Sequence, residues 1–339
     1  FNQSTMSTKH VFDDATGLVE KACLGVASTN PDLRFFAHHK VLYNAAHPRD
    51  KVAILAGGGA GHEPAFSGLV GSGLVTVAVS GDVFASPSSK QICSGVDLAP
   101  TDKGIVTIVL NYTGDCLNFG LASEKARSAF HSEGKGRDIE MVNVGDDVSV
   151  GRSKGGLVGR RGLTGAAFTA KVLGAASEKG DDVQKIAHLG RTMVKNFVTV
   201  GSSLDHCHVP GRSTDPKERG ALSQSAVEIG MGIHNEPGAK HIENKPSGED
   251  LIKEMLELLL REDDPERSFV KFNKDDDPVL IINNLGGMSS IELGAIAAEA
   301  RTQIERDWNL RLSRVYCGTY VTSLNAPGFN ISLLNHKRV

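Results

Sequence analysis

The sequence predicts an α/β fold arranged as two α/β subdomains. Aliphatic and β-branched runs end abruptly at glycine or polar residues, as buried strands do where they open into loops. Apolar residues spaced by three and four lie between these runs and indicate helices, and this alternation is typical of α/β architecture. The chain has 339 residues, enough for about two domains at roughly 150 residues each.

Three runs are predicted as buried strands whose carboxyl ends open into loops. In open α/β sheets, ligands bind at these ends because loops and helix N-termini converge there. The loops that follow the strands are therefore where chemistry is expected. The runs are residues 52–55 before the glycines 57–59, residues 105–110 before Asn111, and residues 279–282 before Asn283.

Five helices are predicted from apolar spacing, over residues 116–130, 166–177, 183–196, 248–260 and 289–308. The charged, proline-containing stretch at 261–278 is predicted to be a solvated loop. Residues 316–322 and 329–334 surround Asn-Ala-Pro-Gly and are predicted to be two strands joined by a turn. A soft boundary near Asn196 divides the chain into a first subdomain at 6–195, with the glycine-rich loop, and a second at 196–335.

Composition excludes several classes of protein. With 37 Lys and Arg against 40 Asp and Glu, the formal charge is −3, and the chain has no basic stripe for binding nucleic acid. No apolar run reaches the roughly 18 residues of a membrane helix, and no secretion signal is visible. Residues 1–5 are interpreted as an expression remnant, with Met6 as the native start. Five widely spaced cysteines predict reduced thiols in a cytoplasmic protein.

The segment Leu55–Pro64 is unusual because it carries four glycines in five positions, 57 to 61. Glycine lets the backbone approach a ligand and present its N–H groups. The loop completes neither the GxxxxGK[ST] phosphate motif nor HExxH, since Phe66 stands where the second His would be. Two interpretations of this segment therefore remain open, a tight structural turn and a site for a polar ligand.

Two further loops carry groups suited to proton transfer or nucleophilic attack. Gly230–Gly238 places His234 among glycines and shares the His, Glu and Pro order of the loop at His62. An imidazole can act as acid, base or nucleophile near neutral pH, although an isolated loop histidine is often only hydrogen-bonded. Asp115 follows a predicted strand at the start of a helix, where either helix capping or general-base catalysis fits.

Other candidates are weaker. Adjacent residues on an extended chain point to opposite faces, so His206-Cys207-His208 is not predicted to bind zinc, and no metal site is expected. Arg160 and Arg161 fit either anion binding or pairing with a surface carboxylate. The amides of Asn283 and Asn284 fit a strand-end site or a turn before a helix.

Six motifs, in order, resemble the substrate-binding K domain of dihydroxyacetone (glycerone) kinases: GGGAGHEP, NYTGD, GRRGL, GMGIHNEPG, NNLGG and GTYVTSLNAPGFNISLL. The resemblance runs from about residue 10 to 335. The stretch at 205–211 and the phrase GIHNE are most similar to the eukaryotic, single-chain, ATP-dependent branch. The resemblance implies two subdomains with mixed sheets flanked by helices, a homodimer, and a helical L domain carrying ATP and Mg²⁺. That L domain is absent here, so no cofactor is expected to bind this chain directly.

The resemblance also implies roles for individual residues. Dihydroxyacetone would be held as a hemiaminal on His234, which selects carbonyl compounds over polyols, and glyceraldehyde is a further candidate substrate. His62 would move a proton during the addition, and Asp115 would take the proton of the hydroxyl that receives phosphate. Gly59, Ala60 and Gly61 would surround the substrate. Leu110 stands where family members commonly have Lys; if only the backbone contacts substrate, the change matters little.

Three functions remain in competition. The favoured one is the substrate-binding half of an ATP-dependent kinase of glycerol metabolism, which alone would bind substrate without phosphorylating it. The alternatives are the K subunit of a phosphotransferase-system enzyme, and a non-catalytic triose sensor that retains the binding histidine.

Overall fold

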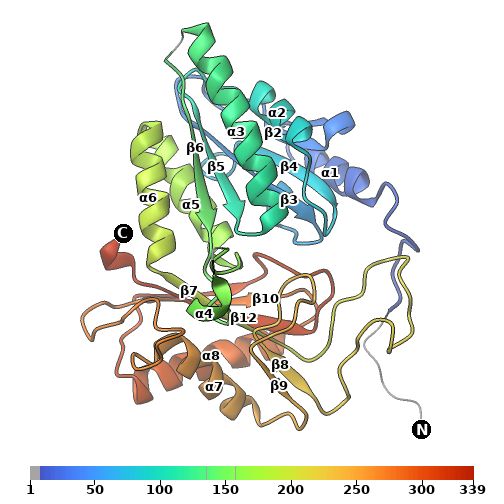
Figure 1. The fold of residues 1–339 in the computed structure, drawn as a ribbon, viewed down its shortest axis with the longest axis vertical. Coiled ribbons are helices and arrows are strands. Elements are labelled where there is room, and N and C mark those ends of the chain that lie inside the picture. Colours follow the sequence, from blue (N-terminus) through green and yellow to red (C-terminus); the bar gives the residue numbers. More distant parts are fainter. Residues whose placement is uncertain (1–7, 135, 157) are drawn as a thin grey trace. The chain divides into compact units, whose positions relative to one another are not determined.

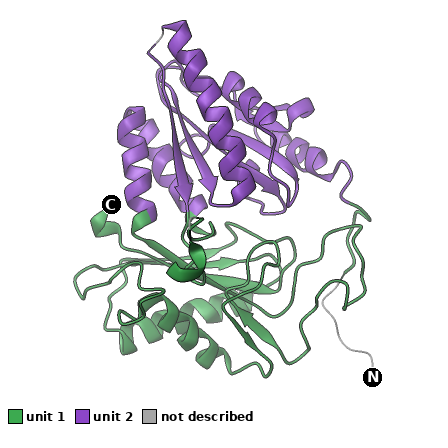
Figure 2. Ribbon diagram, viewed as in Figure 1, with its two compact units in different colours: residues 1–14, 145–165, 195–339 green, residues 15–144, 166–194 purple. Residues whose placement is uncertain are grey.

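The computed structural model describes residues 8–134, 136–156 and 158–339, which form two compact units. Figure 2 shows unit 2, with residues 15–144 and 166–194, in purple, and unit 1, with residues 8–14, 145–165 and 195–339, in green. Each unit contains one six-stranded mixed sheet with helices. The predicted α/β class with mixed sheets is therefore confirmed.

The sheet of unit 2 has the strand order β1-β2-β4-β3-β5-β6 (Figure 1). β3, β4, β5 and β6 are parallel, while β1 and β2 run antiparallel to their neighbours. The strands are β1 (Leu33–Phe36), β2 (Val41–Asn44), β3 (Ala53–Ala60), β4 (Val77–Val83), β5 (Ile105–Leu110) and β6 (Ile139–Val144). The helices are α1 (Leu18–Ser28), α2 (Ser89–Leu98), α3 (Thr113–Glu133), α5 (Gly165–Glu178) and α6 (Val183–Lys195).

Helices cover both faces of this sheet, which explains why the central strands β3 and β5 are buried along almost their whole length. Val109 of β5 packs with Phe119 of α3 in a cluster that also includes residues of α2. On the other face, a Cβ built on Gly190 of α6 would lie 3.0 Å from the side chain of Val142 in β6. The sheet is thus a rigid base for the loops at its carboxyl edge.

The first predicted strand is longer than expected, because β3 continues through Gly57, Gly58 and Gly59 to Ala60. The prediction that these glycines form a loop is wrong. A Cβ on Gly57 would lie 2.3 Å from the carbonyl oxygen of Val79, so glycine is what allows β4 to approach here. The chain turns only at Gly61, where φ is 100°.

The sheet of unit 1 has the order β11-β10-β12-β7-β8-β9, in which β10 and β11 are parallel and the other neighbours antiparallel. Residues of α7 and α8 pack with those of β7, β8, β10 and β12 in one apolar cluster. The elements are α4 (Arg152–Gly155), β7 (Phe197–Ser203), β8 (Val227–Ile229), β9 (Lys240–Ile242), α7 (Gly248–Leu260), β10 (Val279–Asn284), α8 (Ser290–Asp307), β11 (Arg314–Gly318) and β12 (Gly328–Leu334).

The last two strands are not a hairpin. β10 lies between β11 and β12, and β11 covers residues 314–318 rather than the predicted 316–322. Asn283, at the end of β10, explains the difference: its Nδ2 donates to the carbonyl of Val321 at 2.7 Å, and its Oδ1 accepts from the N–H groups of Tyr320 and Val321 at 2.8 and 3.0 Å. The amide therefore holds residues 320 and 321 as a connection rather than as strand.

The second face of this sheet carries a buried polar network that includes the segment 145–165. Asp146 is fully buried and accepts from the N–H groups of Leu163 and Gly165 at 2.7 and 2.8 Å. Thr199 Oγ1 of β7 donates to Asp146 Oδ2 at 2.6 Å. Burial raises the pKa of Asp146, although these hydrogen bonds act in the opposite direction.

The chain consequently passes between the units at 14/15, 144/145, 165/166 and 194/195. The predicted boundary at 195/196 lies beside the last of these crossings. The excursion at 145–165 was not foreseen, because the contacts that assign it to unit 1 join segments far apart in sequence. Within the described ranges, no helix has the length and apolar character to cross a membrane.

Candidate functional site

In unit 2, the loops after β3 and β5 lie at the point where the strand order reverses. The chain leaves β3 towards β4 on one side and leaves β5 towards β6 on the other. In doubly wound sheets this switch point, at the carboxyl ends of the strands, is where ligands bind. Gly61 and His62 follow β3, and Asn111 to Asp115 follow β5.

His62 is buried, with 3% of its surface exposed, and stacks on Phe84 with 5.1 Å between ring centroids. The N–H of Gly61 donates to Glu63 Oε2 at 2.9 Å, and the N–H of Ala65 donates to the His62 carbonyl at 3.1 Å. Burial raises the pKa of Glu63. The segment is thus a tight turn that also holds an imidazole in place.

Asp115 lies in the first turn of α3, whose N-cap is Tyr112, so it is not the capping residue itself. A carboxylate in this turn interacts favourably with the helix dipole. A Cβ built on Gly58 would lie 3.8 Å from both carboxylate oxygens of the buried Asp115. A Cβ on Gly114 would lie 2.7 Å from Ser86 Oγ, so the loop after β4 reaches the same edge.

Leu110 is the last residue of β5 and pairs with Val144 of β6. Only 3% of its surface is exposed. Its neighbour Val109 packs under α3, so the alternation along the strand directs the Leu110 side chain to the opposite face of the sheet.

In unit 1, Glu236 holds His234 through two hydrogen bonds. Oε1 accepts from the imidazole Nδ1 at 2.8 Å, and Oε2 accepts from the backbone N–H of His234 at 2.9 Å. Burial opposes ionisation of Glu236, but the hydrogen bonds and charge of His234 outweigh it and lower the pKa of Glu236 to about 2. When the imidazole is neutral, a carboxylate beside Nδ1 favours the tautomer with the proton on Nδ1 and the lone pair on Nε2.

The start of this histidine loop is fixed by Arg161. Its Nε donates to Oδ2 of the fully buried Asp147 at 2.8 Å, and its Nη2 donates to the Gly230 carbonyl at 2.6 Å. Arg160 donates to the Phe197 carbonyl at 3.1 Å. The prediction of a surface ion pair is therefore wrong for Arg161, because its carboxylate partner is buried fourteen residues away in sequence.

The segment at 206–208 divides its side chains among separate partners. His206 Nδ1 lies 3.2 Å from the Arg219 carbonyl, and His208 Nδ1 lies 2.8 Å from His10 Nε2. In the part of the chain that the structure describes, no group of three or more His, Cys, Asp or Glu residues could hold a metal ion.

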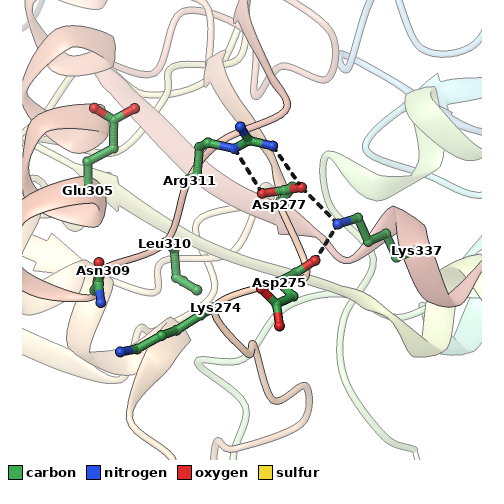
Figure 3. Close-up of a pocket in the computed structure, with 8 residues that line it drawn as sticks. All are labelled: Lys274, Asp275, Asp277, Glu305, Asn309, Leu310, Arg311 and Lys337. Carbon is green, nitrogen blue, oxygen red and sulfur yellow. Dashed lines mark hydrogen bonds and ion pairs between the residues drawn. The ribbon is translucent and has the colours of Figure 1, made fainter.

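A surface pocket of about 470 Å³ in unit 1 is lined by charged side chains that pair with one another (Figure 3). Arg311 donates to Asp277 at 3.2 and 3.3 Å, and Lys337 donates to it at 2.7 Å. These hydrogen bonds lower the pKa of Asp277 to about 2. None of the predicted site residues lines this pocket, which is formed by Lys274, Asp275, Asp277, Glu305, Asn309, Leu310, Arg311 and Lys337.

The structure thus brings most predicted site residues to the carboxyl edge of the sheet in unit 2, and places His234 in unit 1. Sequence reasoning named Glu236 only as part of a motif, and it missed the contacts of both Glu236 and Arg161. The His, Glu and Pro order shared by the two loops was the available signal for Glu236. The residues at the edge in unit 2 are Gly59, Ala60, Gly61, His62, Leu110 and Asp115.

Comparisons with known proteins agree with this architecture. The Dak1 domain model matches residues 24–338. The chain is 44% identical to a dihydroxyacetone kinase of Pichia angusta, with 98% of this chain and 55% of the relative covered. It is 43% identical to dihydroxyacetone kinase 2 of Saccharomyces cerevisiae and 35% to a triokinase/FMN cyclase of Homo sapiens, with 97% and 55% covered in both cases. The chain therefore spans about half the length of these relatives.

Solved structures show the same fold. The dihydroxyacetone kinase from C. freundii, in complex with AMP-PNP and Mg²⁺, matches with a TM-score of 0.82 at 29% identity, over 97% of this chain and 57% of that one. The dihydroxyacetone kinase operon co-activator DhaQ matches with a TM-score of 0.81 at 26% identity, over 93% and 91%. The order of the motifs, the two mixed sheets and these matches agree, and the chain belongs to the Dak1 domain family, as its resemblance to dihydroxyacetone kinases predicted.

Proposed function

We propose that this chain is the substrate-binding part of a longer, ATP-dependent kinase that converts dihydroxyacetone to dihydroxyacetone phosphate, and that it holds the ketone as a hemiaminal on His234. The observation that carries the proposal is the double hydrogen bond from His234 to the ionised Glu236. It occurs in a chain whose yeast relatives are named dihydroxyacetone kinases.

This geometry supports a covalent step. The Nε2 lone pair of His234 forms a bond to the carbonyl carbon, and the π pair of the C=O bond moves onto oxygen. His62 is assigned as the acid that donates a proton to this oxygen, after which solvent reprotonates it. The adduct then carries a positive imidazolium ring, whose charge the Glu236 carboxylate balances at the Nδ1 side.

Asp115 is assigned as the base for the second step. It would accept the proton of the substrate hydroxyl as the phosphoryl group arrives, and the absence of a Cβ at Gly58 leaves space in front of its carboxylate. Gly59, Ala60 and Gly61 would surround the substrate, and Leu110 would contribute its backbone. The contribution of this chain to phosphoryl transfer would be the positioning of one hydroxyl group.

ATP and Mg²⁺ are assigned to an L domain of the whole protein. The C. freundii kinase, of which this chain covers 57%, was crystallised with AMP-PNP and Mg²⁺. When bound, the metal would neutralise charge on the transferring phosphate. The proposal extends to glyceraldehyde, which also has an electrophilic carbonyl, to a homodimer, and to glycerol metabolism in the cytoplasm.

Native mass spectrometry with dihydroxyacetone, without a reducing agent, tests the adduct. We expect a mass increase of one whole substrate molecule, and a soaked crystal should show continuous density from the substrate to Nε2 of His234. His234→Ala should abolish the adduct. His241→Ala is the matched control, because His241 also pairs with a glutamate two residues later, Glu243, at 3.3 Å. An adduct that survives in His234→Ala would contradict the proposal.

The match to DhaQ favours a second candidate, a triose sensor without kinase activity. That co-activator shares this fold over 91% of its length. Joining the chain to an ATP-binding L domain separates the two functions. With ATP and Mg²⁺, a kinase half should support formation of dihydroxyacetone phosphate, whereas a sensor should form the adduct without turnover.

A further inference from the structure

Asn235 occupies an unusual position between His234 and Glu236. Its φ is 63°, in the left-handed region that few residues other than glycine adopt, with Asn among the more tolerant. Its side chain makes two hydrogen bonds with the backbone of Cys207, one as acceptor and one as donor. Oδ1 accepts from the Cys207 N–H at 3.0 Å, and Nδ2 donates to the Cys207 carbonyl at 3.2 Å. The histidine loop is thereby attached to a segment almost thirty residues earlier.

The residue before His234 is attached as well. Ser323 Oγ donates to the carbonyl of Ile233 at 2.6 Å. Cys207, to which Asn235 is bonded, is itself buried. The residues on both sides of His234 are therefore attached, Ile233 to Ser323 and Asn235 to Cys207.

Cys207 belongs to the excursion formed by residues 204–226 between β7 and β8. The ion pair between Asp205 and Arg219, at 3.1 Å with side chains 11% and 4% exposed, joins its first residues to its second half. Asp205 Oδ1 also accepts from the N–H of Leu222 at 3.0 Å. Because this pair is largely removed from water, losing one partner would leave an uncompensated charge, and the base of the excursion is fixed in place.

We propose that Asn235 is a positioning residue for His234, and that the excursion at 204–226 aims the imidazole through Cys207. The proposal rests on the proposed role of His234 as the nucleophile. Addition to a small ketone requires Nε2 to point at the carbonyl carbon, so only loop conformations with that orientation bind substrate. When only a fraction of the molecules has the binding-competent loop conformation, the apparent affinity is the intrinsic affinity multiplied by that fraction.

Asn235→Gly tests this most directly. Glycine accepts the positive φ without strain but removes both hydrogen bonds to Cys207. We expect the apparent affinity for dihydroxyacetone, measured from adduct formation, to fall about 10-fold, which is about 1.4 kcal/mol, with full adduct restored at saturating substrate. Lys217→Ala, at an exposed position of the same excursion, is the matched control and should bind like the wild type.

Hydrogen exchange of the substrate-free protein separates this inference from the proposed function. In Asn235→Gly, the amides of residue 207 and of residues 232–236 should exchange faster than in the wild type. If the wild type forms no adduct, the proposed function fails while the exchange rates still decide whether Asn235 fixes the loop. Affinity within twofold of wild type, or unchanged exchange, would overturn the positioning role. Should Asn235→Gly not fold, Ser323→Ala removes the attachment of Ile233 and is judged by the same two measurements.

Discussion

Replacing Glu236 by Gln should weaken unit 1 in a pH-dependent way. The pKa of Glu236 lies at about 2, against an ordinary value of 4.5, because the hydrogen bonds and charge of His234 outweigh the effect of burial. The folded state therefore prefers the ionised form more strongly than the unfolded chain does. This contribution is complete above about pH 4.5 and is lost as the pH falls towards 2.

The magnitude follows from the size of the shift. A change from 4.5 to about 2 corresponds to about 3 kcal/mol, since one pKa step is about 1.4 kcal/mol. A third of the Glu236 side chain is exposed, and solvent screening reduces the value. We expect Glu236→Gln to lower the free energy of unfolding of unit 1 by about 1–2 kcal/mol at pH 7.

Urea denaturation followed by tryptophan fluorescence measures this difference. The sequence has one tryptophan, Trp308, which packs against the apolar cluster of unit 1 and so reports on the unit that carries Glu236. Wild type and Glu236→Gln are compared at pH 7, 5 and 3.5, with Glu243→Gln as the control, because Glu243 is exposed and also pairs with a histidine two residues earlier. The gap between wild type and Glu236→Gln should narrow at pH 3.5. A gap that stays constant across this range would refute the electrostatic reasoning.

Three further predictions follow from contacts in the two units. Gly57→Ala should destabilise unit 2 by at least about 3 kcal/mol, because its Cβ would meet a backbone oxygen at 2.3 Å. Gly25→Ala, within α1 and with nothing within 4 Å of the new Cβ, should stabilise unit 2 by about 0.5–1 kcal/mol. Equal melting temperatures of the two variants in thermal denaturation would contradict this. Gly58→Ala should fold normally, since the Asp115 carboxylate lies 3.8 Å from the new Cβ, but should reduce turnover of the full-length kinase. Asp115→Asn should reduce this turnover by at least ~100-fold while adduct formation persists, and an undiminished rate would contradict the role of Asp115 as the base. Asp146→Ala should cost unit 1 about 2–4 kcal/mol, because two N–H groups and a hydroxyl lose their buried acceptor, and an unchanged urea midpoint by tryptophan fluorescence would show that water replaces it.

Local sequence patterns predicted five helices that the structure contains, but α1, α2 and the short α4 were not predicted. The helix predicted at 248–260 coincides with α7, whose apolar residues face one cluster and whose N-cap, Ser247, accepts from the N–H of Asp250. The glycine run was misassigned, because the reason it is strand lies in Val79, about twenty residues later in sequence. The C-terminal strands were misassigned for the same kind of reason, since β10 separates them.

The sequence pointed to the candidate residues of the site but not to the side chains that hold them. The rule that ligands bind at carboxyl edges led to His62 and Asp115, which the structure places at one edge. The hydrogen bonds between His234 and Glu236 depend on side-chain geometry within a turn, and the carboxylate partner of Arg161 is the buried Asp147, fourteen residues earlier. Neither is visible in the spacing of residues along the chain.

The insertion of residues 145–165 into unit 1 has a consequence for synthesis on the ribosome. Unit 2 has all of its residues once position 194 has left the exit tunnel, whereas unit 1 must await β12 near the end of the sequence. Until β7 has been synthesised, Asp146 has no Thr199 to donate to it, and its carboxylate stays hydrated. Vectorial translation therefore favours an order of assembly in which the glycine-bearing sheet forms first and the sheet that presents His234 closes last.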